Sequence, residues 1–281
     1  MYVSWRKKMS RLIRGRLWSM TLSKHGIGVV AETKNGLLVV DPSDFGVSGS
    51  LLSQGCYDWT AISWLLGVLN QESRIVFVGA HLGARLVPIA LRSGSRHIVA
   101  FEPAPRNHWL LKMNLAINGL SEVIVHHHAV GATEGSVRFT ENPINTGNSR
   151  VSLVGETCVP MTTLDTALQF QRRDTDLLVL DVEGFEVHAM RGATWSLEHT
   201  RYFYVEYAPE QLMEQGSSAS EFIDMVASRF DSMYLQGSPT RFLPSRSYVK
   251  YLRELPMRRG LLLNLLFSNE TGAELKLLTT Q

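Results

Sequence analysis

Acidic side chains directly follow two apolar runs in this 281-residue chain. Asp181, Glu183 and Glu186 come within six residues of one another, and Glu206 follows a later run. Carboxylates this close repel one another unless a cation, a shared proton or a metal is near. A carboxylate beside a reacting hydroxyl can also orient it and accept its proton. We therefore interpret Asp181, Glu183 and Glu206 as candidate catalytic residues, Asp181 first. The structural alternative leaves Glu186 solvated and has Glu183 capping the next helix.

A glycine-rich turn earlier in the chain has the composition of a nucleoside-binding loop. Gly79, Ala80 and Gly83 are small, so the backbone can approach a ligand closely there. Glu102 lies 23 residues after Gly79, where an acid at the next strand end can accept both hydroxyls of a ribose. The spacing is Gly-x-x-x-Gly rather than Gly-x-Gly-x-x-Gly, which disfavours a nicotinamide oxidoreductase.

Histidines supply further candidates for proton transfer. His81 lies inside the glycine-rich turn and is a second candidate base, because imidazole titrates near neutral pH. The run His126-His127-His128 resembles a metal-binding tract, yet adjacent side chains of a strand point to opposite faces. At most His126 and His128 then share a face. We therefore expect these histidines to line a pocket, and we expect no metal site.

Short apolar runs that alternate with helical patterns must position these residues. Strands are predicted over Arg74–Val78, His97–Phe101, Val123–Val125, Leu177–Leu180 and Tyr202–Val205. The alternation predicts a doubly wound, mostly parallel α/β sheet of Rossmann-like type, covered by helices on both faces. Right-handed crossovers then bring the strand ends at Gly79, Glu102, Asp181 and Glu206 to one edge, where ligands bind in such sheets.

The chain before this alternating part is predicted to form an extension, residues 1–70, ahead of a main domain over 71–281. A hairpin is predicted around Asn35-Gly36, which lies between two apolar runs. A loop over 44–50 and a helix over 59–69 follow it. Two later strands, Ser136–Thr140 and Leu262–Phe267, are expected to run antiparallel, the last at the edge of the sheet.

The order of these motifs resembles that of FkbM-family methyltransferases. The matching stretches are Phe77–Gly83, Val99–Pro103, His127–Gly131, Leu180–Glu186 and Arg191–Ala193. The resemblance covers about residues 75–206. It implies a doubly wound α/β fold, S-adenosylmethionine as the cofactor and methylation of a hydroxyl on a sugar, glycan or secondary metabolite.

The resemblance also implies roles for individual residues. Gly79, Ala80, His81 and Gly83 would lie against the methionine and ribose part of the cofactor. Glu102 with Pro103 would hold the ribose, His128 and Ala129 the adenine, and Asp181 would lie beside the methyl group. The stretch Asn145-Thr-Gly-Asn-Ser149 resembles a polar loop that approaches the active site, so that the candidate substrate residues are Asn145, Gly147, Asn148 and Ser149.

Two positions depart from the family pattern. The family usually has Asp and Asn where this chain has Phe77 and His81. The missing Asp often helps to orient the cofactor's amino-acid end. The alternative function is therefore a catalytically weak or inactive methyltransferase-fold protein that acts as a ligand- or partner-binding module.

Composition and charge narrow the range of partners. Lys and Arg number 28 against 26 Asp and Glu, and a net charge of +2 argues against a dedicated nucleic-acid binder. The basic residues of segment 6–16 alternate with apolar ones, which suits contact with an anionic membrane surface, although no apolar run is long enough to span a membrane. Two distant cysteines fit a reducing compartment. We expect a cytoplasmic protein that could also contact a membrane surface peripherally. No pattern in the sequence indicates an oligomeric state.

Overall fold

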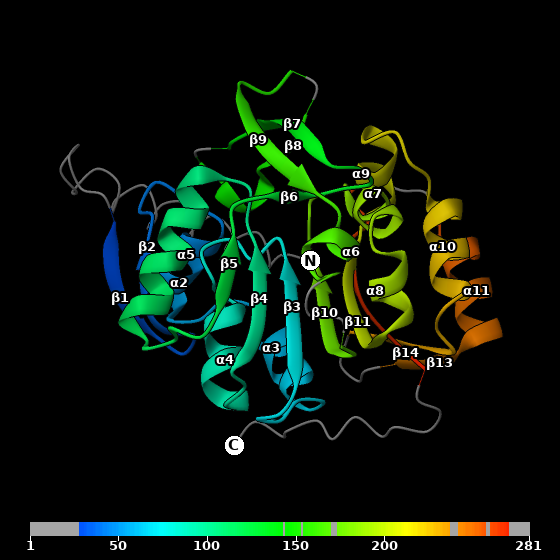
Figure 1. Ribbon diagram of the computed structural model, residues 1–281, viewed down its shortest axis with the longest axis horizontal. Coiled ribbons are helices and arrows are strands. Elements are labelled where there is room, and N and C mark those ends of the chain that lie inside the picture. The colour runs from blue at the N-terminus through cyan, green and yellow to red at the C-terminus, as the bar shows by residue number, and fades with distance from the viewer. Residues whose placement is uncertain are drawn as a thin grey trace, which may run out of the picture.

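The fold is built on an eight-stranded sheet with helices on both faces (Figure 1). The computed structural model describes residues 28–269 except 143, 153, 170–172, 237–240 and 257–258. The strands in sheet order are β13 (Arg241–Pro244), β12 (Ser232–Leu235), β14 (Leu263–Ser268), β11 (Thr200–Tyr207), β10 (Thr175–Leu180), β3 (Arg74–Val78), β4 (His97–Phe101) and β5 (Ile124–His126).

Five neighbouring strands of this sheet, β11 through β5, run parallel, and β14, β12 and β13 are added antiparallel. The predicted mostly parallel, Rossmann-like α/β fold is therefore confirmed. The late strand does run antiparallel, but it lies third from its edge, because the sequence analysis missed β12 and β13 beyond it. Both strands are only four residues long, and neither shows a clear alternation of apolar and polar residues.

Side chains alternate along each strand between two apolar cores. Ile75 and Phe77 of β3 pack in one core with α3 (Trp59–Leu66), α4 (Leu86–Ser93) and α5 (Pro105–Ile117). Val76 and Val78 pack in the other core with α7 (Glu186–Arg191), α8 (Thr194–Glu198), α10 (Ala219–Ala227) and α11 (Ser245–Glu254). Since both faces of the sheet are covered, the polar ends of the strands are left as the place for a ligand site.

The predicted hairpin is present as β1 (Val29–Thr33) and β2 (Gly36–Val40), paired antiparallel. Asn35 at its turn is fully buried and donates through Nδ2 to the carbonyls of Tyr57 and Ala84. The described part of the extension thus shares a core with the main sheet, and its division from the rest near residue 70 stays a prediction. The loop expected over 44–50 is wrong in part, because α2 (Val47–Gln54) begins within it.

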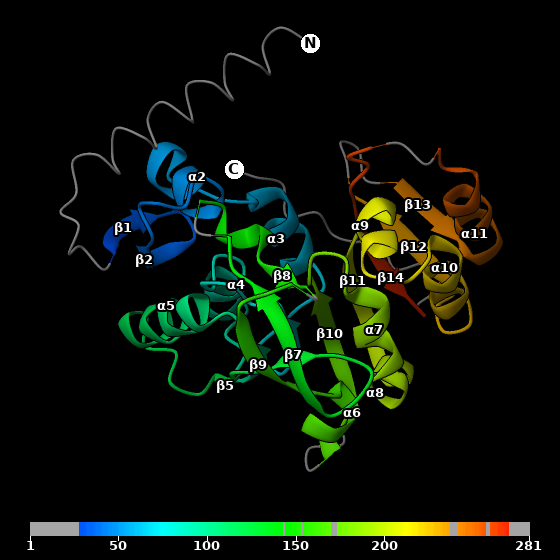
Figure 2. The same cartoon turned by 90° about the horizontal axis from the view of Figure 1, so that it is seen from above.

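A second, four-stranded sheet lies over the carboxyl ends of β3 and β4 (Figures 1 and 2). Its order is β6 (Ala129–Val130), β9 (Thr157–Thr162), β7 (Gly135–Thr140) and β8 (Arg150–Val151). The strand predicted over Ser136–Thr140 is β7, and it pairs antiparallel with β8 and β9 as expected. The short elements α6 (Leu164–Ala167), α9 (Pro209–Glu214) and a 3₁₀ turn over Thr146–Asn148 complete the described fold.

No helix in the described ranges is both long and apolar enough to cross a bilayer. The basic segment 6–16 lies outside the described residues. Cys56 and Cys158 are both free thiols.

Candidate active site

A cavity opens where the parallel strands end, beneath the second sheet. The turn after β3, the ends of β4 and β10, and residues of β7 and β8 form its walls. The lining side chains with polar or aromatic groups are Tyr57, Phe77, His81, Arg85, Phe101, Glu102, Asn107, His128, Phe139, Thr146, Ser149, Asp181, Glu183 and Phe185. Of the other predicted site residues, Gly79, Ala80, Pro103, Ala129 and Gly147 also line it. Gly83, Asn145, Asn148 and Glu206 do not belong to this lining.

The glycine turn is shaped by contacts within the protein. Gly79 has a φ of 85°, and a Cβ there would lie 1.8 Å from the backbone oxygen of Asp181. Gly83 has a φ of 90° and faces Leu111 of α5, with 2.9 Å between its ideal Cβ position and Leu111 Cδ1. Gly79 therefore lets β3 and β10 end side by side at the cavity, whereas Gly83 serves the packing of α5.

Glu102 is buried at the end of β4 and holds the glycine turn. The backbone N–H of His81 donates to its Oε2 (2.7 Å), and that of Ala104 donates to its Oε1 (2.9 Å). Burial raises the pKa of Glu102 to about 7, although these hydrogen bonds and one from Asn107 act in the opposite direction. Each oxygen keeps a further lone pair, so the carboxylate can still accept from a ligand in the cavity.

His81 joins the glycine turn to the polar loop over 145–149. Its backbone is left-handed, with a φ of 53°, and its Nε2 lies 2.8 Å from Thr146 Oγ1. Burial lowers the pKa of His81, so the ring is neutral at pH 7. Nδ1 of the ring is buried and has no partner among the described residues. His81 can therefore accept or donate one further hydrogen bond inside the cavity.

The polar loop reaches the cavity through only some of its predicted residues. Thr146, which the sequence analysis did not single out, is buried, and its N–H donates to Asp44 Oδ1 (3.2 Å). Thr146 Oγ1 and the loop residues Gly147 and Ser149 face the cavity. Asn148 is exposed, and Asn145 is half-buried and does not line the cavity.

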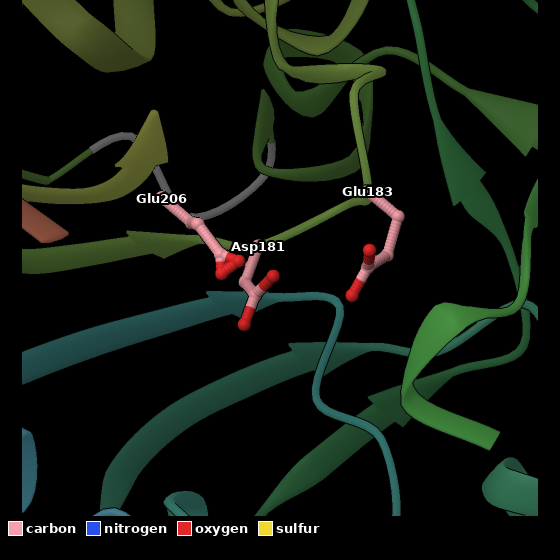
Figure 3. Close-up of side chains that lie close together, drawn as sticks. All are labelled: Asp181, Glu183 and Glu206. Carbon is pink, nitrogen blue, oxygen red and sulfur yellow. The ribbon is translucent and has the colours of Figure 1, made fainter. Parts of the chain in front are cut away.

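Three carboxyl groups meet at the ends of β10 and β11. Asp181, Glu183 and Glu206 each present an oxygen within 4.8 Å of the others (Figure 3). Burial, and then repulsion by Asp181, raise the pKa of Glu183 to about 8 and that of Glu206 to about 9. At neutral pH these two carboxyls therefore hold protons, which relieves the repulsion. A group of this kind could also hold a cation, and the expected absence of a metal stays a prediction.

Arg85 is the cation of this site, and the sequence analysis missed it. Its Nη1 donates to Asp181 Oδ2, and its Nε donates to Asp58 Oδ2 (2.6 Å). Burial by itself lowers the pKa of Arg85, but attraction to Tyr204, Asp181, Tyr57 and Asp58 raises it well above its ordinary value. Arg85 directly precedes α4, two residues after the glycine turn, and that position alone could have suggested a cation at this edge.

The turn after β10 fixes Glu183 in an unusual conformation. Glu183 has a φ of 55°, a region that non-glycine residues rarely adopt. Oε1 of Glu186 accepts from the N–H groups of Val182 and Gly184 and so closes this turn. The alternative in which Glu186 is solvated and Glu183 caps the helix is wrong, since Glu186 is 2% exposed and closes the turn itself. Glu183 is left free to line the cavity.

The three histidines at and after the end of β5 make aromatic contacts. His126 stacks on Phe101, and His127 stacks on His108 and lies 3.0 Å from the carbonyl oxygen of Pro103 through Nε2. His128 lines the cavity, and its buried Nδ1 has no partner among the described residues. The expected pocket lining is thus observed for His128.

Phe77, at the position of the missing family Asp, is 2% exposed in the middle of the sheet and belongs to the core. It also contributes to the cavity floor. The position therefore offers no carboxylate to the cavity.

Comparison with known proteins gives one sequence match. The family model described as the methyltransferase FkbM domain matches residues 78–233, more than half of the chain. No curated protein matches the sequence.

Three solved structures share parts of the fold at low identity. An rRNA methylase from Streptococcus thermophilus is 10% identical with a TM-score of 0.43, over 75% of this chain and 95% of that chain. A precorrin-6y C5,15-methyltransferase from Geobacter metallireducens is 7% identical with a TM-score of 0.40, over 75% of this chain and 87% of that chain. An O-methyltransferase from Bacillus cereus in complex with SAH is 12% identical with a TM-score of 0.41, over 74% of this chain and 78% of that chain. The family assignment therefore rests on the match over residues 78–233.

Proposed function

This chain belongs to the FkbM methyltransferase family, and from that premise we propose that it methylates a hydroxyl oxygen of a sugar, glycan or small metabolite. Membership implies S-adenosylmethionine as the methyl donor. The observation that carries the proposal is the meeting of Asp181 and Glu183 in one cavity with the glycine turn and Glu102. Cys56 and Cys158 are free thiols, which supports the cytoplasm as the proposed location.

The cavity has features that fit S-adenosylmethionine. Buried nitrogens of His81 and His128 lack partners among the described residues and could bond polar groups of the ligand. Phe101 offers an apolar wall for a base, and Glu102 has lone pairs for ribose hydroxyls. The carboxylate of Asp181, which lines the cavity, suits a positively charged sulfonium. When bound, the cofactor supplies a methyl group that its sulfonium has already activated.

Asp181 and Glu183 would then divide the remaining work. Asp181, fixed by Arg85, would accept a hydrogen bond from the acceptor hydroxyl and hold that oxygen in line for attack. The pKa of Glu183, about 8, is close to the working pH, which suits a group that takes up and releases a proton. Glu206, which does not line the cavity, would share a proton with these two carboxyls. His81 remains a further candidate base.

The second candidate function is a binding module without turnover. Phe77 in place of the family Asp and the pairing of Asp181 with Arg85 both favour it, because each removes a free carboxylate from the site. Calorimetric titration with S-adenosylmethionine and S-adenosylhomocysteine tests the cofactor first. Mass spectrometry of a glycan and metabolite panel then looks for the gain of one methyl group. Cofactor binding without any methylated product would favour the module, and no cofactor binding at all would contradict the proposal.

A further inference from the structure

A row of polar side chains continues from the acidic group onto strands that lie beyond the cavity. Leu180 of β10 is in register with Val205 of β11, so Asp181, directly after β10, lies beside Glu206 of β11 (Figure 3). Glu206 is in register with Asn264 of β14. The backbone hydrogen bonding between β14 and β12 continues one residue past the end of β12, because the N–H of Gln236 donates to the carbonyl oxygen of Asn264 (3.0 Å). At this edge of the sheet, four adjacent strands therefore carry Asp, Glu, Asn and Gln in a row.

These side chains lie on the same face of the sheet. Residues paired directly across neighbouring strands share a face, and residues two apart along a strand do as well. Tyr204, Leu266 and Tyr234, each two positions further into its strand than a member of the row, all belong to the core on the α3 side. The row thus follows the carboxyl edge on that side, where Arg85 contacts Asp181.

The two amides in this row have unsatisfied oxygens. Asn264 Oδ1 and Gln236 Oε1 are buried, and neither has a hydrogen-bond partner among the described residues, although each residue is partly exposed. A buried acceptor without a donor destabilises a protein unless a ligand or another group supplies the donor. Glu206 holds a proton at neutral pH and could supply one donor to its neighbour Asn264. Gln236 lies one strand further away and needs another source.

We propose that Glu206, Asn264 and Gln236 form an acceptor subsite that binds the hydroxyl groups of an uncharged, polyhydroxylated ligand of the sugar class. This rests on the proposed function, because the row would hold the part of the acceptor that extends beyond the methylated hydroxyl. Amides both donate and accept, which matches neighbouring hydroxyls. From Asp181 to Gln236 the row spans three strand spacings, or about 14 Å, enough for more than one sugar ring.

The chemistry of the row also selects against charged ligands. Asn264 and Gln236 are neutral amides and Glu206 is protonated at neutral pH, so the negative charge of Asp181 would repel a carboxylate or phosphate on the ligand. A neutral sugar should therefore bind better than its uronic acid. A ring with a single hydroxyl should bind more weakly than either sugar, since it can satisfy only one member of the row.

Saturation-transfer NMR with D-galactose, D-glucose, L-rhamnose and lactose tests the proposal on the full chain, with and without S-adenosylhomocysteine. D-Galacturonate and cyclohexanol serve as the charged and the single-hydroxyl control ligands. We expect at least one neutral sugar to bind at millimolar concentration and better than both controls. Asn264→Ala and Gln236→Ala should each weaken its binding about tenfold. Gln71→Ala, an exposed amide ahead of β3 and so at the other edge of the sheet, should bind sugar as the wild type does.

Thermal unfolding shows whether each variant is folded, and Asn264→Ser and Gln236→Asn replace any alanine variant that is not. Three results would overturn the proposal: no neutral sugar binds the wild type, the variants bind sugar undiminished, or galacturonate binds better than galactose. Cofactor titration on the same samples separates this result from the proposed function. A wild type that binds sugar through Asn264 and Gln236 but no cofactor supports the subsite and contradicts the methyltransferase.

Discussion

Asp181 and Glu183 are the two members of the acidic group that line the cavity, and their surroundings differ. Asp181 is paired with Arg85, whereas the only side-chain hydrogen bond found for Glu183 among the described residues is a long one from Gln211 Nε2 (3.4 Å). An ion-paired carboxylate is fixed in place but is a weaker proton acceptor, while a carboxyl with a pKa of about 8 exchanges protons readily. The two roles can therefore be separated by amide substitutions.

If Asp181 takes the proton of the substrate hydroxyl, Asp181→Asn should lower turnover by about 10²–10⁴-fold while changing cofactor affinity far less. If Asp181 only aligns the hydroxyl, Glu183→Gln should instead show the larger loss and should flatten the pH dependence of kcat. Steady-state kinetics on an identified acceptor, together with cofactor titration, check both variants. Glu198→Gln, at an exposed position, is the matched control. Near-normal turnover in both variants would leave His81 as the next residue to substitute.

Glu102 gives a second prediction, which concerns the cofactor. Its carboxylate fixes the N–H groups of His81 and Ala104, so its loss would loosen the turn and also remove the acceptor for the ribose. Glu102→Ala should weaken S-adenosylmethionine binding more than tenfold, because two charge-assisted hydrogen bonds worth about 1.5–3 kcal/mol each are lost. The affinity of Glu102→Gln, which keeps one acceptor oxygen, should lie between the affinities of the wild type and of Glu102→Ala. Unchanged affinity by calorimetry would mean that Glu102 serves the fold alone.

Among the elements, β3 carries the departure from the family pattern. Phe77 is buried among apolar residues at the centre of the parallel strands. Phe77→Asp should therefore destabilise the protein by about 3–5 kcal/mol, since it creates a cavity and buries a carboxyl without a partner. Denaturant unfolding measures the loss, and Phe77→Leu should cost much less. A stable Phe77→Asp variant with tighter cofactor binding would show instead that the position still belongs to the cofactor site.

The elements that bear the site were predictable because each parallel strand is a short apolar run that ends in a residue with polar or small character. Gly79, Glu102, Asp181 and Glu206 were expected at one edge on this basis, and the strands that precede them are parallel neighbours. The sequence analysis missed helices α2, α6, α8, α9 and α11 and strands β6, β8, β9, β12 and β13. All of these except α11 have only two to eight residues, which carry too little periodicity. Arg85 was missed because its partners, Asp58 and Asp181, are distant in sequence and meet only through the fold.

Across the whole molecule, the carboxyl edge of the sheet concentrates acids that keep their protons. Burial raises the pKa of Glu102 and of Glu186 to about 7, of Glu183 to about 8 and of Glu206 to about 9. In the unfolded chain, these groups return to values near 4.5. At these four groups, the folded protein thus binds more protons than the unfolded chain does between pH 4.5 and about 9. By linkage, these four carboxyls make the free energy of unfolding fall as the pH rises through this window.

Below about pH 6.5, histidines with a lowered pKa, such as His81, act in the opposite direction. We therefore expect the denaturant midpoint at constant ionic strength to fall from pH 7 to pH 9. Glu206→Gln should flatten this fall, most of all above pH 8, because a glutamine holds no proton to lose and no charge to repel Asp181 and Glu183. Glu198→Gln, exposed on α8, should leave the slope unchanged. A midpoint that rises over this range would contradict the protonated state of the group and would favour a bound cation among Asp181, Glu183 and Glu206. Added S-adenosylmethionine should reduce the fall, since its positive sulfonium stabilises the ionised carboxylates.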